Sequence, residues 1–133
     1  MITNASMRKA MRAIAKKKGD FTLFAIVRRS DALGCWDLVV SAPWLGEGSL
    51  KTTRELVRLL ANSIGRSSLT NFARVDTLKA AHPMVKFMLA NFAVDDGELR
   101  IPSTDSFGPH IEEGVVFRAK RPVTTRRTAK RVA

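Results

Sequence analysis

The basic residues of this chain are concentrated at its two ends, and this limits which part of it can form a core. Thirteen of the 23 Lys and Arg residues lie in residues 1–18 and 118–133, and neither range contains Asp or Glu. The two ends contribute +6 and +7 to the net charge of +11, and the segment between them contributes −2. Because like charges repel one another, a compact core has to come mainly from the nearly neutral centre.

Length and composition fit one compact domain. The chain has 133 residues, of which 45% are hydrophobic, and this is enough apolar material for one core but not for two. The charge pattern divides the chain into three parts. We predict a basic N-terminal helix docked on the core (1–18), an α+β core (19–121) and a disordered basic tail (122–133).

Cysteine usage and hydropathy bear on the cellular compartment. Cys35 is the only cysteine, so the chain has no intrachain disulfide and no pair of thiol ligands for a metal. No apolar run approaches the roughly 18 residues that a membrane-spanning helix needs. We therefore expect a soluble, cytoplasmic protein with no membrane span.

Hydrophobic periodicity predicts three helices and five strands. Apolar residues recur every three or four positions in the helices and alternate with other residues in the strands. The predicted helices cover residues 6–17, residues 50–64 and a segment from Pro83 to just before Asp95, and the predicted strands cover residues 21–28, 35–41, 72–78, 98–101 and 110–118. The order α-β-β-α-β-α-β-β predicts a single-domain α+β fold, in which two or three helices pack on a mostly antiparallel sheet of about five strands.

The first predicted hairpin carries the most distinctive sequence of the chain. It reads FTLF at residues 21–24 and WDLVVSAPWL at residues 36–45. In this pattern the chain resembles small uncharacterised bacterial proteins, over most of residues 20–118. The resemblance implies a bacterial protein with a self-contained core, to which the basic ends are additions, and it implies no activity.

The basic ends predict binding to the phosphate backbone of nucleic acid. Each Lys or Arg that neutralises a phosphate releases counterions, and the tail has no aromatic residue to stack on bases, so little sequence preference is expected. The predicted phosphate contacts are Arg8, Lys9, Arg12, Lys16, Lys17, Lys18, Arg121, Arg126, Arg127, Lys130 and Arg131. The N-terminal segment is also basic, amphipathic and free of acids, as organelle presequences are, and that alternative stays open.

A protein-interaction or homodimerisation module with no nucleic-acid role is the main alternative. Aromatic side chains in loops are typical of protein contacts, and Trp44 and Phe107 both fall in predicted loops. A protein partner or a second copy of the chain would then bind there. Exposure of the two rings separates this hypothesis from the first one.

An acidic and histidine-containing cluster suggests a third class, a metal-dependent phosphodiesterase or nuclease. Its candidate metal ligands are Asp105, His110 and Glu112, because carboxylates and imidazole can hold a divalent metal that activates water. Such acids are more often a solvated surface, which we favour here. The chain lacks a Gly-rich phosphate loop, a zinc-ligand pair and a nucleophile-elbow serine, so the sequence indicates no catalytic residue and no cofactor.

Overall fold

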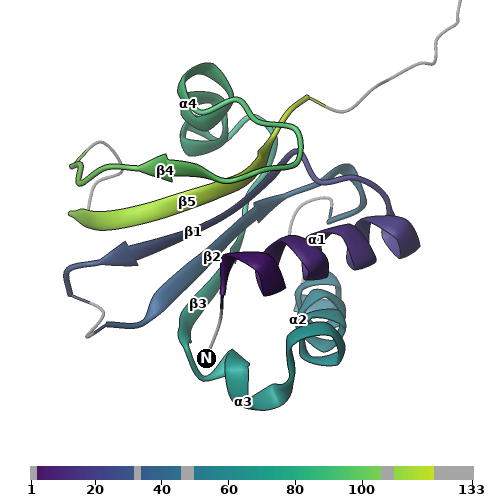
Figure 1. The fold of residues 1–133 in the computed structure, drawn as a ribbon. Helices are drawn as coiled ribbons and strands as arrows, with labels where there is room; N and C mark the ends of the chain where they lie inside the picture. The colour runs from purple at the N-terminus through teal and green to yellow at the C-terminus, as the bar shows by residue number, and fades with distance from the viewer. Residues whose placement is uncertain (1–2, 32–33, 46–49, 106–109, 122–133) are drawn as a thin grey trace, which may run out of the picture.

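The computed structural model describes residues 3–31, 34–45, 50–105 and 110–121, which form helices around one five-stranded sheet (Figure 1). The strand order in the sheet is β3-β2-β1-β5-β4. In chain order the elements are α1 (Asn4–Lys18), β1 (Leu23–Arg29), β2 (Trp36–Ser41), the 3-10 turn η1 (Pro43–Leu45), α2 (Leu50–Ile64), α3 (Arg66–Leu69), β3 (Phe72–Thr77), α4 (Pro83–Asn91), β4 (Leu99–Ile101) and β5 (Ile111–Ala119).

The predicted single-domain α+β fold is confirmed, with a mixed sheet. β1 pairs antiparallel with β2 and β5, and β4 pairs antiparallel with β5. β2 and β3 run parallel, because α2 and α3 form a crossover that returns the chain to the same end of the sheet. The short helix α3 follows α2 directly and was not predicted, so the described residues contain four helices instead of two or three.

Helix α1 begins and ends at well-formed caps. The side chain of Thr3 accepts a hydrogen bond from the Ser6 backbone N–H, and the Ser6 hydroxyl accepts one from the Thr3 N–H, both at 3.0 Å. At the other end the Gly19 N–H donates to the Ala15 carbonyl, with a positive φ of 118° that favours glycine. Helix α1 is part of the core, because its apolar side chains are buried: Met7, Ala10, Met11 and Ile14.

The strands carry apolar side chains on both faces of the sheet, and different helices cover the two faces. α1 and α2 pack on the face that includes Phe24, Leu38 and Phe117. α4 packs on the opposite face, which includes Leu23 and Val39 (Figure 1). The core therefore has two layers separated by the sheet, as the alternation of buried residues in β1 and β2 requires. None of the described helices is long and apolar enough to span a bilayer.

Candidate functional site

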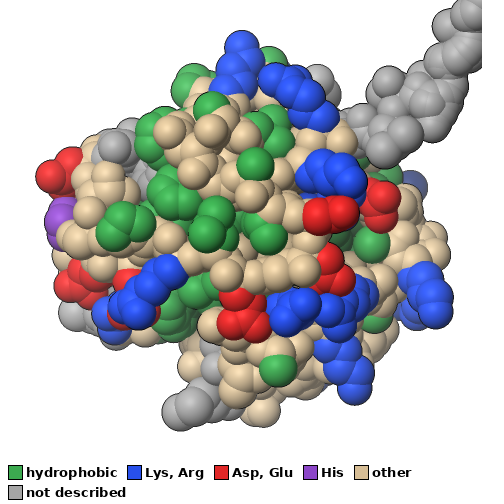
Figure 2. All heavy atoms as spheres, turned by 45° about the horizontal axis from the view of Figure 1, so that its top comes forward, with side chains coloured by type: hydrophobic (Ala, Val, Ile, Leu, Met, Phe, Trp, Pro, Cys, Tyr) green, Lys and Arg blue, Asp and Glu red, His purple; other side chains and the backbone are tan. Residues whose placement is uncertain are grey.

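Two of the basic side chains predicted to bind phosphate are ion-paired to the core. Arg12 Nε lies 2.7 Å from Asp96 Oδ2. Arg8 Nε lies 3.4 Å from Asp96 Oδ1, and Arg8 Nη1 lies 3.4 Å from Glu98 Oε2. Both acids belong to the turn between α4 and β4. Figure 2 shows acidic side chains next to basic ones over this side of the molecule. These two arginines therefore hold α1 against the turn.

The same turn shows the electrostatic effect of these pairs. The hydrogen bond from Arg12 lowers the pKa of Asp96 below its ordinary value, and Arg8 adds to that effect. Its neighbour Asp95 accepts a hydrogen bond from Lys120 Nζ at 3.1 Å, which lowers the pKa of Asp95. Arg118 contributes to the same shift. The turn is thus a cluster of ionised carboxylates that neutralises cations of α1 and β5.

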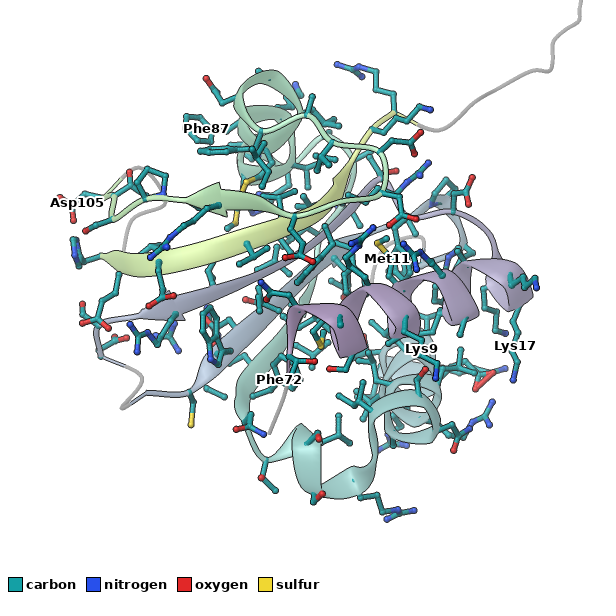
Figure 3. The ribbon with its side chains drawn as sticks, viewed as in Figure 1. Lys9, Met11, Lys17, Phe72, Phe87 and Asp105 are labelled. Carbon is teal, nitrogen blue, oxygen red and sulfur yellow. The ribbon has the colours of Figure 1, made fainter. Side chains whose placement is uncertain are left out.

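Three other predicted residues of α1 remain available to an external anion. Lys9, Lys16 and Lys17 are exposed, and within the described ranges none of them has an ion pair. Figure 3 shows Lys9 and Lys17 on α1, away from the side on which Met11 enters the core. Lys18 is exposed as well, but its Nζ lies 3.3 Å from Glu55 Oε2 in α2, so it has an ion pair.

Helix α2, which packs beside α1, adds cations that were missing from the predicted set. Lys51 and Arg54 are exposed and have no ion pair among the residues that the structure describes. Together with Lys18, Arg58 and Glu55 they line a hollow of about 710 Å³. We call Lys9, Lys16, Lys17, Lys51 and Arg54 the α1–α2 basic face. The sequence could have indicated the two α2 residues of this face, because the helix contains three cations and only one acid.

The C-terminal basic residues also include both ion-paired and unpaired cations. Arg118 belongs to β5, where its Nε donates to the Phe21 carbonyl at 2.6 Å and its Nη1 pairs with Asp95 at 2.6 Å. Arg121 is exposed and has no ion pair in the described part of the chain. The remaining predicted contacts lie outside the described residues: Arg126, Arg127, Lys130 and Arg131.

Trp44 is half-buried and serves the fold. Its ring lies edge-on to Phe21 with centroids 5.7 Å apart, and its Nε1–H donates to the Gly19 carbonyl at 3.2 Å. Trp44 therefore links η1 to the C-terminal end of α1 by this hydrogen bond. Phe107, the other predicted partner contact, lies outside the described residues.

The candidate metal ligands come together only in part. His110 Nδ1 lies 2.8 Å from Asp105 Oδ1, near the tip of the β4–β5 hairpin (Figure 3). Glu112 pairs instead with Arg28, at 3.5 Å. In the described ranges no three His, Cys, Asp or Glu side chains converge on one metal position. Ser103, which was not predicted as a site residue, completes a row of hydroxyl, imidazole and carboxylate, with its Oγ 3.1 Å from His110 Nε2.

A buried polar cluster on the α4 side of the sheet was not predicted from the sequence. Asp37 is 1% exposed, in the otherwise apolar strand β2. Its Oδ2 accepts hydrogen bonds from Arg29 Nε at 2.6 Å and from Arg74 Nη2 at 3.5 Å. Its Oδ1 is buried and has no donor among the described residues. A carboxylate at a buried strand position was the available signal, because period-two alternation places Asp37 on the same face as Val39.

Two further polar groups from β3 and the β3–α4 turn border this cluster. Arg74 Nη2 lies 3.2 Å from Asp76 Oδ2 and so links the two carboxylates. Burial raises the pKa of Asp76 above its ordinary value, against the opposing charge of Arg74. His82 caps α4 by accepting a hydrogen bond from the Met84 N–H at its Nδ1. All of these groups line one cavity of about 280 Å³.

Comparison with known proteins finds no matching family model, no matching curated protein and no matching solved structure. The described residues offer two candidate places for a ligand: the α1–α2 basic face and the cavity beside Asp37.

Proposed function

We propose that this protein binds the phosphate backbone of nucleic acid, without base preference, through the α1–α2 basic face together with the basic residues of its C-terminal end. One observation carries this proposal. The described acids of the α4–β4 turn pair with Arg8, Arg12, Arg118 and Lys120, whereas the five cations of the α1–α2 basic face have no ion pair among the residues that the structure describes. Unpaired cations can approach phosphates without first losing an internal ion pair.

The arrangement of these cations favours a long polyanion over a compact ligand. Lys9 and Lys17 are two turns apart on α1, and Lys51 and Arg54 lie on the neighbouring helix. Cations spread over two helices match successive phosphates of a strand. The basic face contains no aromatic side chain that could stack on a base, so recognition of sequence is not expected.

The test is a salt titration of binding to labelled duplex DNA and single-stranded RNA. Each phosphate contact contributes about −0.9 to the slope of log affinity against log salt on duplex DNA. We expect the double variant K9Q/K17Q to make that slope shallower by roughly 2. The full chain is used because α1 supplies four buried side chains, so a chain without residues 1–18 would lose part of its core.

The matched control is the double variant K86Q/R100Q, which removes two exposed cations of α4 and β4. It lowers the net charge by the same amount but leaves the α1–α2 basic face intact. The proposal predicts a nearly unchanged slope for this control. Equal losses in the two variants would mean that net charge alone attracts the nucleic acid. Absence of binding by the full chain near physiological salt would refute the proposal.

A further inference from the structure

Strand β3 forms one edge of the sheet, and β4 forms the other (Figure 1). Among the described residues β3 pairs only with β2, along one of its two sides. It has six residues, whereas β4 has three, so β3 is the longer of the two edges. The backbone of an edge strand can pair with a strand from another chain. The outer side of β3 is therefore a surface at which a second chain could extend the sheet.

Alternate residues of β3 direct their backbone groups away from β2. The Leu78 N–H donates to the Val40 carbonyl at 2.8 Å, on the β2 side of the strand. Because the backbone groups of successive residues point to opposite sides of a strand, those of Val75 and Thr77 point outward. In the part of the chain that the structure describes, neither residue has a backbone hydrogen bond outside the sheet. These outward groups are available to pair with another strand.

The charges of β3 are complementary to those of a second copy of the same strand. Arg74 and Asp76 lie on one face of β3, and Arg74 Nη2 is 3.2 Å from Asp76 Oδ2. The Arg74 side chain is 53% exposed and that of Asp76 is 34% exposed. Many exposed edges carry charges that prevent pairing between copies. This edge instead has one cation and one anion on either side of Val75, so each charge meets its opposite when two such strands run antiparallel.

Hydrogen bonding and charge together select one register for that pairing. A shift by one residue would place outward backbone groups against inward ones, so the allowed registers differ by steps of two residues. In one register Val75 lies opposite Val75 of the second copy, and Arg74 lies opposite Asp76. A step of two in either direction places Arg74 opposite Arg74, or Asp76 opposite Asp76. Like charges directly opposite one another destabilise a strand pair.

We propose that two copies of this protein associate through antiparallel pairing of their β3 strands, with Val75 on the two-fold axis and Arg74 of each copy paired to Asp76 of the other. The two Val75 residues exchange both of their N–H···O bonds. Arg74 and Asp76 occupy the adjacent non-hydrogen-bonded positions, where opposite side chains are closest. The two-fold axis is then perpendicular to the joined sheet, so both α1–α2 basic faces lie on the same side of it. The association goes beyond nucleic-acid binding and does not depend on it.

The first test is sedimentation equilibrium of the full chain, without nucleic acid, from micromolar to millimolar protein. A six-residue strand buries little area, so we expect weak association and a mass that rises with concentration toward that of a dimer. A monomer over the whole range would overturn the proposal. That result would leave the binding proposed for the α1–α2 basic face unaffected, because the measurement contains no nucleic acid.

Charge reversal tests the surface and its register. Arg74→Asp and Asp76→Arg each place like charges opposite one another, and each should weaken self-association by about tenfold or more. An equimolar mixture of these two variants restores opposite charges at every position, so it should form mixed dimers about as tightly as the wild type. Arg100→Asp is the matched control, because it makes the same charge change on the other edge strand and should leave association unchanged. Equal association of the single variants and the wild type, or no gain in the mixture, would refute the assignment.

A disulfide cross-link provides a second readout that leaves the two charges in place. In the proposed register the Cα atoms of the two Val75 residues lie about 5.5 Å apart, within the range that a disulfide spans. Val75→Cys, in a Cys35→Ser background, should therefore form a covalent dimer under mild oxidation. Thr77→Cys in the same background is the control, because the two Thr77 residues lie four positions out of register. Equal cross-linking of both variants, or none by Val75→Cys, would contradict the proposed register.

Discussion

The two faces of the sheet are built from the same strands but hold different kinds of side chain. Beneath α1 and α2, β1 and β2 present Phe24, Leu38 and Val40, all fully buried. Beneath α4, the same two strands present Val39 but also the buried Asp37, which pairs with the partly buried Arg29. Apolar packing is the main source of folding free energy, whereas a buried ion pair is weak evidence for stability. We therefore expect truncations beneath α1 and α2 to lower the free energy of unfolding more than truncations beneath α4.

The largest effect that would test this contrast is a truncation in the apolar face. Phe24 is fully buried, with ring centroids 4.9 Å from Phe21 and 6.2 Å from Phe117. Phe24→Ala should lower the free energy of unfolding by about 3–5 kcal/mol, through lost burial and the cavity left behind. Chemical denaturation measures it. Met88→Ala, on the α4 side, is the matched comparison, and a larger loss there would contradict the assignment of stability to the α1–α2 side.

The Arg29 and Asp37 pair offers a second test, with a smaller effect. Asp37→Ala removes the buried partner of Arg29, which is partly exposed and keeps its ion pair with Asp31, so the free energy of unfolding should fall by about 2 kcal/mol. Replacing both residues by apolar ones of similar size, as R29M/D37L, should restore most of that loss or exceed the wild-type stability. Denaturation of the single and double variants measures the difference. A double variant as unstable as Asp37→Ala would show that the pair holds the fold together.

The sequence predicted the elements well where the pattern is local. The helix expected at 50–64 has those bounds in the structure, because its apolar spacing and the glycine at its end are both local signals. The parallel pairing of β2 with β3 could not be read in the same way, since it depends on where the crossover helix packs. The short helix α3 has too few residues to produce a periodic signal.

The candidate sites were harder to predict, because they depend on residues far apart in the chain. Asp96 pairs with Arg8 and Arg12, which are 88 and 84 positions away, so no local pattern could show that these cations are neutralised. Asp37 did break the apolar alternation of its strand, and that signal was available. Its partner Arg74 comes from β3, which only the parallel pairing brings beside β2.

The smallest effect concerns two carboxylates, Asp96 on the α1 side and Asp76 on the α4 side, whose pKa values are shifted in opposite directions. The lowered pKa of Asp96 stabilises the fold above the ordinary carboxyl pKa, and this contribution is lost as pH falls through the folded-state value. The raised pKa of Asp76 stabilises the fold at low pH, and that contribution is lost as pH rises through its folded-state value.

Asparagine variants separate the two carboxylates when the free energy of unfolding is measured from pH 3 to pH 7. Asp96→Asn should destabilise the protein at pH 7 by about 0.5 kcal/mol, as expected for an exposed ion pair, and the difference from wild type should close on acidification. Asp76→Asn should match wild type at pH 3 and become more stable than wild type as pH rises. If both variants changed the pH profile in the same direction, the two carboxylates would share one kind of environment, and the contrast between the α1 side and the α4 side would fail.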